Sequence, residues 1–545
     1  MVQLISMFSF LAVLFRSAIL CSQSLVAGGI LFLLATRREA LGQDEFHRAA
    51  WKLIRWSTAG LVVSHVIFAG TICLVLTYSA DIPLREVLSA NFVLAGLLAI
   101  TAGLAIELWP ASVSKRLNGL LLFPTGMMLA ASVMTSHSAS RMENRLPLVT
   151  VTALHYLATA SWIGGLPYLL VAMKRVSDTA VKEQVARKFS RLAVMSVALL
   201  FSAGLALSLE YVGSWEALYG TAYGAMVATK VILFGCLLLL GAANFFIVRR
   251  MGSSGGSGTT SLVRYAEAEI GIGLSVILAA TSLTSQPPAV DLTQDRVSLQ
   301  EIATRYAPRT PRFSSPDVKE LSEPTNQRLR RAAAEGKNVP DSFVPGQFAA
   351  ESNNPADIAW SEYNHNWAGL IVFLMGILAL LSRSRYFSWA KVWPLMFLGL
   401  AVFLFLRADP ENWPLGPNGF WESFAVPDVL QHRVAVLLIT AFAIFTWRAE
   451  TNRVKSMAPA LVFPGVCVLG GMLLLTHSHS LGNIKEELLV ELSHTSLAIL
   501  GIVAGWSRWL ELRLPGENKA RKYLPWLWPV CFILMGLILM DYHES

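Results

Sequence analysis

The chain has 545 residues, of which 54% are hydrophobic and only 15% are charged, and its formal net charge is +8. Soluble domains carry roughly a quarter charged residues, and the mean hydropathy here is positive, at +0.52. The composition therefore excludes an ordinary soluble globular protein. The excess positive charge lies mostly in short loops between apolar runs, so it gives no reason to expect nucleic acid binding.

Fourteen apolar runs follow one another along the chain, each about as long as a helix that spans a bilayer. Their centres lie near residues 23, 65, 97, 126, 160, 201, 236, 276, 375, 399, 438, 467, 495 and 532. We predict an all-α fold: a polytopic integral membrane helix bundle with about 14 transmembrane helices in an 8 + 6 arrangement. The predicted domains are an eight-helix membrane domain over residues 1–286, a periplasmic linker over 287–366 and a six-helix membrane domain over 367–545.

Lys and Arg concentrate in every second loop, as they do in loops that stay in the cytoplasm. The basic clusters follow the first, fifth, seventh, eleventh and thirteenth helices, and examples are Arg37, Arg38, Lys174, Arg175, Arg249, Arg250, Arg448, Arg453, Lys519 and Arg521. We therefore predict that the chain lies in membrane lipid and that both termini face the outer side of the membrane.

The polar segment from Gln286 to Asn366 is rich in Pro, Arg and Glu, and it contains no His, Met or Cys before His365. It is a poor candidate for a metal-carrying domain, and we expect a partly ordered linker or docking surface. The stretch GSSGGSG at residues 252–258 is predicted to be a flexible connector. It has the glycines of a phosphate loop but no following Lys, so no nucleotide site is expected.

A short motif with histidine occurs once in each half of the chain. MTSHSAS at residues 134–140 precedes TALHYLATASWIGGL at 152–166, and LTHSHSLG at 475–482 precedes ELSHTSLAILGIVAGW at 491–506. In each half, a Ser-His-Ser sequence ends one predicted helix at the outer surface, and a further His follows in the next helix. This repeat indicates that the same structural unit, two consecutive helices that each carry a histidine, occurs once in each half.

The neighbours of these histidines indicate metal chemistry. Met134 and His137 share a helix face, as do Glu491 and His494. Thioether with imidazole suits copper, and Met favours the cuprous ion. The predicted metal-binding residues are His137, His155, Met134, His479, His494, His477 and Glu491. The alternatives are that the Met side chain fills an apolar core and that a single intramembrane His only bridges helices, although polar groups in a bilayer are usually functional.

His477 and His479 point about 200° apart if both lie on a helix, so they can face one ion only where the helix has ended. We predict that His479, which aligns with His137, is the functional partner of His494. Glu269 and Arg191 are expected at the same depth, where an ion pair is plausible. Arg16 and Lys230 lie in the outer halves of their helices, and each either extends outward to solvent or takes part in the site.

Three consecutive stretches resemble a known family: FSRLAVMSVALLFSAGLALSLEYVGSW, YGTAYGAMVATKVILFGCLLLLGAANFF and YAEAEIGIGLSVILAATSLTSQPPA. Together with the preceding LHYLATASWIGGLPYLL, they are similar to the copper-resistance D (CopD) membrane domain. The resemblance covers residues 120–288, and the last six helices look like an extension seen in longer relatives. The shared positions are His155, Trp162, Gly164, Gly165, Arg191, Tyr223, Gly224, Lys230, Glu269, Pro287 and Pro288.

The resemblance implies non-enzymatic copper transport or copper tolerance at the bacterial cytoplasmic membrane. It also implies a small periplasmic copper carrier (CopC-like) as a separate partner, since no such domain is fused to the chain. A second hypothesis remains open, in which histidines on adjacent helices ligate haem b and the chain is an electron-transfer subunit. A third is that the chain is a scaffold for other membrane subunits, which would tolerate the loss of every histidine named.

Overall fold

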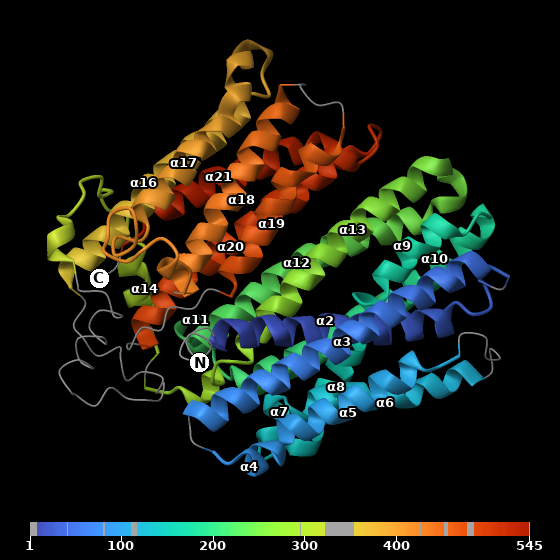
Figure 1. The fold of residues 1–545 in the computed structure, drawn as a ribbon. Coiled ribbons are helices and arrows are strands. Elements are labelled where there is room, and N and C mark those ends of the chain that lie inside the picture. Colours follow the sequence, from blue (N-terminus) through green and yellow to red (C-terminus); the bar gives the residue numbers. More distant parts are fainter. Residues whose placement is uncertain are drawn as a thin grey trace.

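The computed structural model describes residues 8–40, 42–79, 82–110, 117–294, 296–321, 354–425, 427–451, 456–476 and 484–543. Within these residues the structure is helical; they contain no β-strand, and Asn412 and Asn418 form an isolated bridge. The helices lie side by side in two groups, coloured blue to green and orange to red in Figure 1. The predicted all-α class is confirmed.

The first group, here called the first bundle, contains most of the helices before residue 284. Its helices are α2 (Phe8–Ala35), α3 (Asp44–Ser79), α4 (Leu84–Leu88), α5 (Asn91–Glu107), α6 (Leu122–Met134), α7 (His137–Ser140), α8 (Arg145–Trp162), α9 (Leu166–Arg175), α10 (Thr179–Tyr211), α11 (Trp215–Gly220), α12 (Ala222–Arg249) and α13 (Met251–Leu283). A 3-10 turn, η1 (Leu117–Leu121), leads into α6.

The second group, here called the second bundle, begins after residue 354. Its helices are α16 (Pro355–Leu381), α17 (Met396–Arg407), α18 (Pro427–Glu450), α19 (Val462–Leu474), α20 (Ile484–Arg513) and α21 (Leu524–Met540). Four 3-10 segments connect them: η4 (Arg385–Leu395), η5 (Glu422–Ala425), η6 (Ala458–Leu461) and η7 (Lys519–Lys522).

The predicted membrane spans agree with these helices. In the part of the chain that the structure describes, ten helices are long and apolar enough to cross a membrane, and four shorter apolar helices accompany them. Each of the fourteen predicted centres falls within one of these helices. The chain is therefore a multi-pass membrane protein, and it remains a prediction that all fourteen helices cross the bilayer.

The glycine pair after Trp162 determines how two helices of the first bundle cross. A Cβ atom on Gly164 would lie 1.8 Å from the carbonyl oxygen of Ser24, and one on Gly28 would lie 2.4 Å from that of Ala160. Helices α2 and α8 therefore touch through their backbones, the close approach that small residues allow in membranes. The hydroxyl of Tyr168 adds a 2.9 Å hydrogen bond to the carbonyl of Leu25.

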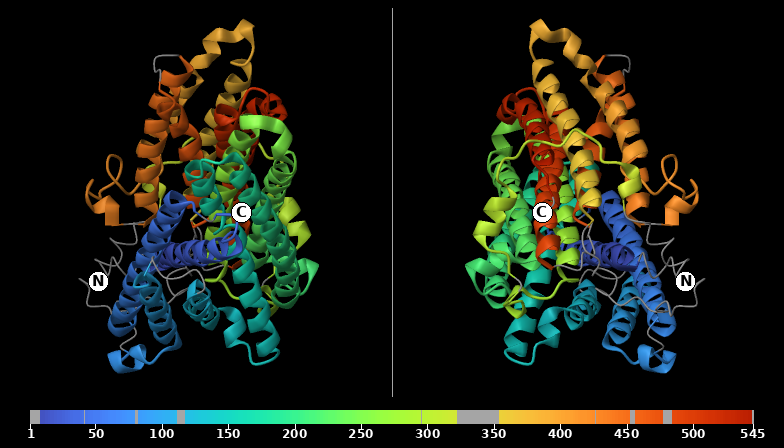
Figure 2. Two further views of the ribbon diagram at one scale, coloured as in Figure 1. Left: turned by 90° about the vertical axis from the view of Figure 1, so that its right-hand side faces the viewer. Right: turned by 90° about the vertical axis from the view of Figure 1, so that its left-hand side faces the viewer.

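Helix α20 joins the two bundles. Ala498 and Ile502 on α20 belong to the core of the first bundle, whereas Ala504, two residues further on, belongs to the core of the second. A Cβ atom on Gly271 of α13 would lie 1.6 Å from Cζ2 of Trp506, so the indole occupies the space beside that glycine. The side views in Figure 2 show the red C-terminal helices against the green helices of the first half.

One prediction about a segment outside the apolar runs is wrong. The stretch GSSGGSG, predicted to be a flexible connector, is helical and forms the start of α13. Glycine is weak in helices, but here the helix continues without interruption into an apolar span that packs on α12 and α20. The described part of the polar segment after α13 reaches residue 321 and contains short helical elements.

This described part, residues 287–321 without residue 295, is called the outer strap. It contains η2 (Ala289–Asp291), α14 (Leu299–Arg305) and η3 (Val318–Glu320), and Ser298 and Glu301 form a capping box at the start of α14. The strap packs across both bundles: the amide of Val297 donates to Gly220, and Lys485 pairs with Glu301 at 2.9 Å. The end of the bundles that it covers is the one predicted to be periplasmic, and it is called the outer end below.

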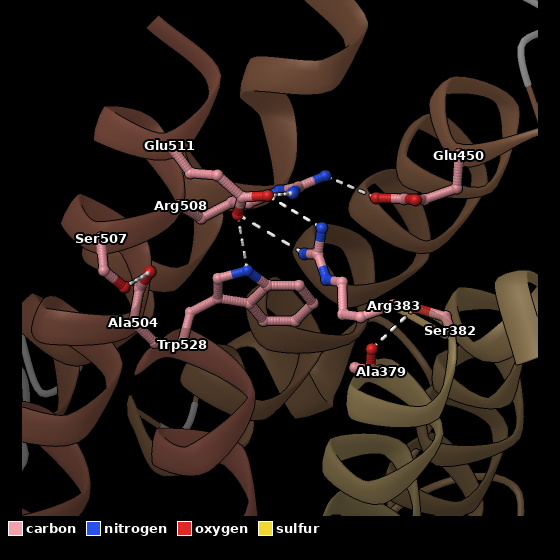
Figure 3. A network of polar contacts seen from close by, with 9 residues as sticks. All are labelled: Ala379, Ser382, Arg383, Glu450, Ala504, Ser507, Arg508, Glu511 and Trp528. Carbon is pink, nitrogen blue, oxygen red and sulfur yellow. Dashed lines mark hydrogen bonds and ion pairs between the residues drawn. The ribbon is translucent and has the colours of Figure 1, made fainter. Parts of the chain in front are cut away.

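At the opposite, inner end of the second bundle, four charged side chains and a tryptophan form one network (Figure 3). Glu511 accepts contacts of 2.8 Å from Nη1 of Arg383, Nη1 of Arg508 and Nε1 of Trp528. Arg508 also pairs with Glu450. Because these residues come from α18, α20, α21 and the end of α16, the network ties four elements together.

Candidate functional site

The Ser-His-Ser motif of the first half lies where α6 ends and the short helix α7 begins. The hydroxyl of Ser138 lies 2.6 Å from that of Thr152 on α8 and 2.9 Å from that of Tyr211 on α10. These contacts hold His137 between two aromatic rings, with centroid distances of 6.2 Å to Tyr211 and 6.3 Å to Tyr223. Nε2 of His137 is buried, and no described residue offers it a hydrogen bond.

His155 lies three residues after Thr152 on α8 and packs against α10. A Cβ atom on Gly204 would lie 3.7 Å from its Cε1 atom, so the missing side chain of Gly204 leaves room for the imidazole. Nδ1 of His155 is also buried with no hydrogen-bond partner among the described residues. Lys230 of α12 lies within electrostatic reach of this ring.

Charged side chains surround His137. The Arg16 guanidinium donates to Thr284 at 3.3 Å, and Arg141 pairs with Asp291 at 3.1 Å. Burial lowers the pKa of His137, the charges of Arg16 and Arg141 lower it further, and Asp291 opposes them. The imidazole is therefore neutral at pH 7, which is the state that binds a metal ion.

Met134 occupies a different environment from the two histidines. Its side chain is 40% exposed and lines a groove of about 710 Å³ between α6 and α8, together with Leu154 and Leu157. Neither His137 nor His155 lines this groove. The sequence places Met134 and His137 on one helix face, but α6 ends at Met134, so the chain turns between them.

In the second half, the structure describes only some of the predicted site residues. His477 and His479 lie outside the described residues, so the predicted pairing of His479 with His494 stays a prediction. His494 is buried at 8% exposure, and its Nδ1 contacts the carbonyl of Val490 at 2.9 Å. The carboxylate of Glu491 accepts two 3.4 Å contacts from Gln286, which links α20 to the end of α13.

Two neighbours of His494 were not predicted as site residues. The ring of His365 on α16 lies 6.3 Å from that of His494, and the ring of Tyr542 stacks on His365 at 4.0 Å. The sequence carried one signal for His365, which is its place at the end of the segment predicted to be periplasmic. Nothing in the sequence pairs it with His494, because the contact depends on how α16 packs beside α20 and α21.

The expected ion pair between Glu269 and Arg191 is wrong. Glu269 is 2% exposed, accepts a 3.2 Å hydrogen bond from Nε1 of Trp162 and accepts a second from the amide of Asn244. No ion pair of Glu269 occurs among the described residues. The two neutral donors come from α8 and α12, so the carboxylate lies between three helices of the first bundle.

In the described ranges, no three side chains of the His, Cys, Asp and Glu types are arranged to hold a metal ion. Most of the described histidines instead occur singly or in pairs near the outer end. The fold and these side chains define a multi-pass helical membrane protein with buried imidazoles below its outer surface.

Comparison with known protein families gives one match. Residues 183–283 match the family described as "Copper resistance protein D" (CopD), so this segment of the chain is similar to that family. Arg191, Tyr223, Gly224, Lys230 and Glu269 lie within the matched range. His155 and the glycine pair lie before it.

A curated relative points the same way. The chain is 29% identical over 193 residues to "Copper transport protein CutJ" of Bacillus subtilis (strain 168), and the alignment covers 34% of each chain. The chain thus matches about a third of the length of that relative. No solved structure matches the chain. These comparisons support a copper-related membrane function, whereas the haem b hypothesis gains no support from them.

Proposed function

We propose that the protein transports copper across the cytoplasmic membrane without catalysing a reaction, and that His137 and His155 receive the ion at the outer end of the first bundle. One observation carries this proposal: each of these histidines has a buried ring nitrogen with no partner among the described residues. Polar groups left unpaired inside a protein are costly, so their retention in a bundle that is similar to the CopD family favours a ligand role.

The surrounding charges favour a monovalent ion. Arg16, Arg141 and Lys230 lie near the two histidines and repel any cation. Coulomb repulsion is proportional to the charge of the ion, so a cuprous ion is repelled half as strongly as a cupric ion. Met134, if the chain around Thr135 rearranges, would add a thioether that also prefers the cuprous state.

Transport needs a driving force, and the chain shows no ATPase signature in its sequence. The membrane potential contributes about 2.3 kcal/mol per charge per 100 mV, which is sufficient to favour inward movement of a monovalent cation. We therefore propose uptake driven by the potential. In this proposal a separate CopC-like periplasmic carrier delivers copper to the outer end, and both chain termini lie in the periplasm.

Glu491, His477, His479 and His494 belong to the same proposal as a second receiving region in the second half. Glu491 lies at the contact between the bundles, beside Gln286. In this proposal, Glu491 passes the ion between the two halves.

Copper binding by purified full-length variants tests the first site. Replacing either His137 or His155 by Ala should remove most of the copper bound at one site, and the double variant should lose little more, because ligands of one ion are not additive. His47→Ala is the matched control, since its Nδ1 already contacts the carbonyl of Gln43 at the inner end. Wild-type copper binding in the double variant would reduce both histidines to packing residues.

A further inference from the structure

A second pair of histidines meets at the outer end of the second bundle, from helices that are far apart in the sequence. The ring centroids of His365 and His494 are 6.3 Å apart, and their planes are inclined by 77°. Two imidazoles that bind one ion from opposite sides have centroids about 6 Å apart, because each metal–nitrogen bond is about 2 Å and each nitrogen lies about 1 Å from its ring centre. The observed separation fits that arrangement.

The hydrogen bonds fix which nitrogen of each ring carries the lone pair. Nδ1 of His365 lies 2.8 Å from the carbonyl of Ser361, and Nδ1 of His494 lies 2.9 Å from that of Val490. A carbonyl only accepts, so in both neutral rings the hydrogen is on Nδ1 and the lone pair is on Nε2. A metal-ligating histidine commonly donates its other N–H to a backbone carbonyl in this way.

A polar cavity of about 340 Å³ lies near this pair, between the outer strap and the ends of α16 and α21. Tyr542 connects the cavity to the histidine pair. It lines the cavity, and its ring stacks on that of His365 with a centroid distance of 4.0 Å. His543 also lines the cavity and is only 6% exposed. Its Nδ1 contacts the carbonyl of Asp541 at 3.0 Å, and its Nε2 is buried with no hydrogen-bond partner among the described residues.

The cavity wall carries both signs of charge. The outer strap supplies Arg309 and Arg312, and the helix ends supply Glu362 and Asp541. Arg312 pairs with Glu362 at 3.0 Å, whereas among the described residues Asp541 accepts a backbone amide from Arg309, at 3.2 Å, and forms no ion pair. The carboxylate of Asp541 thus provides negative charge at the cavity beside His543, which attracts a cation.

We propose that His365 and His494 form a second copper-binding site, reached from the outer side past His543 and Tyr542. The proposal rests on the proposed copper transport and extends it to the second bundle, outside the residues that match the CopD family. Imidazole is a softer ligand than carboxylate, so a pair of imidazoles suits a monovalent copper ion better than a hard divalent one. The pair then gives His494 a partner on α16 in addition to the predicted one in residues 477–483.

The test measures the number of cuprous ions bound per purified full-length chain, by competition with a chromophoric cuprous chelator. The variants are His365→Gln, His494→Gln and their double, and Gln is chosen because it keeps polarity and bulk at buried positions. His432→Gln is the matched control, since His432 lies in the same bundle and pairs with Asp409 at 2.9 Å. Gel filtration and the thermal midpoint without copper check that each variant is folded.

We expect wild type to bind one more copper ion than His365→Gln, His494→Gln or the double variant, and the double variant to equal the single ones. Copper should also raise the thermal midpoint less in these variants, because a ligand that binds the folded state stabilises it. X-ray absorption of the His137→Ala/His155→Ala protein should show copper with two nitrogen neighbours.

The outcomes separate the two proposals. If His365→Gln and His494→Gln bind as much copper as wild type while His137→Ala loses an ion, the second site is wrong and the first stands. If only the His365 and His494 variants lose an ion, the second site stands and the first is wrong. If a Gln variant does not fold, His543→Gln is tested in its place. This variant should bind copper more slowly than wild type without binding fewer ions. An unchanged binding rate would overturn the proposed path.

Discussion

Nε1 of Trp162 donates a 3.2 Å hydrogen bond to Glu269, and this contact joins α8 to α13 inside the first bundle. Asn244 on α12 donates to the other oxygen of the same carboxylate. One buried acidic group therefore accepts from two helices through neutral donors. This arrangement differs from an ion pair, because it remains intact if the carboxyl group is replaced by a neutral amide.

Replacing Glu269 therefore separates the role of its charge from that of its hydrogen bonds. In Glu269→Ala, Trp162 and Asn244 both lose their acceptor, and each buried group left unpaired costs about 1–3 kcal/mol. In Glu269→Gln, the new carbonyl accepts from Trp162, and Asn244 can turn its amide so that Oδ1, which now has no partner, accepts from the new NH₂ group. We expect a clearly lowered thermal midpoint for the Ala variant and a near-normal one for Gln.

The measurement is thermal unfolding of both variants in one detergent. Equal destabilisation of the Gln and Ala variants would mean that the negative charge itself is needed, and would point to a cationic partner for Glu269.

The contact between Gly271 and Trp506 makes a second prediction, about how the bundles join. A methyl group at residue 271 would overlap the indole, and overpacking of this kind costs about 1–3 kcal/mol. We expect Gly271→Ala to lower the thermal midpoint and Trp506→Leu in the same chain to restore part of it. Gly235→Ala is the control, because nothing lies within 4 Å of a Cβ atom there. Equal effects at residues 235 and 271 would show that the cost is not one of packing.

The apolar runs predicted the fold well, because a membrane span depends on local composition and length more than on tertiary contacts. GSSGGSG shows where local preference fails: its glycines favour a loop, yet the residues that follow form a long apolar helix, and α13 begins ahead of them. Propensity is a weak guide where tertiary packing fixes the neighbouring helix.

The site was less predictable. The Ser-His-Ser motif predicted a role for His137, and the structure shows that its neighbour Ser138 anchors α7 to α8 and α10. That His137 binds a metal ion stays a prediction. The meeting of His365 with His494 could not be read from the sequence, because it depends on the packing of α16, α20 and the residues after α21. The partners of Glu269 were missed for the same reason, since Asn244 and Trp162 come from two other helices.

The attachment of the outer strap gives a prediction about pH. The ammonium of Lys485 and the N–H and hydroxyl of Ser298 lower the pKa of Glu301 to about 2. Since this folded-state pKa lies below the unfolded value of about 4.3, the contact stabilises the fold fully above pH 4.3 and loses its effect as the pH falls toward 2. The group is exposed, so the effect is small.

We therefore expect the difference in thermal midpoint between wild type and Glu301→Gln to be constant from pH 7 to about 5 and to shrink below that. Lys485→Gln should show the same profile. A difference that already changes between pH 7 and 6 would mean that Glu301 is not held by Lys485.

The predicted topology can be tested with single cysteines in a chain whose native cysteines have been replaced. Residue 182 lies in the first turn of α10 and residue 516 in the loop after α20, both among basic residues. Both should react with a membrane-impermeant thiol reagent only after the membrane is opened. Glu216→Cys is the control at the outer end, where its exposed side chain lies on α11 and should react in intact spheroplasts. Labelling of residues 182 and 516 from the periplasm would reverse the proposed direction of transport.

The inner network of Figure 3 provides the last prediction, because its charges differ in burial from those of ordinary surface pairs. Glu511 is the acceptor shared by Arg383 and Arg508. Glu511→Gln leaves Arg383 without a carboxylate partner in a largely buried position, and breaking such a pair costs about 3–5 kcal/mol. Glu450→Gln should lower the free energy of unfolding by less, since Arg508 retains Glu511.

Glu45→Gln is the surface control. It should lower the free energy of unfolding by under about 1 kcal/mol, because Glu45 and Arg175 are 58% and 55% exposed. Thermal unfolding of the three variants should give midpoints in this order, and a midpoint for Glu511→Gln as high as that for Glu45→Gln would show that the network contributes nothing to holding α16, α18, α20 and α21 together.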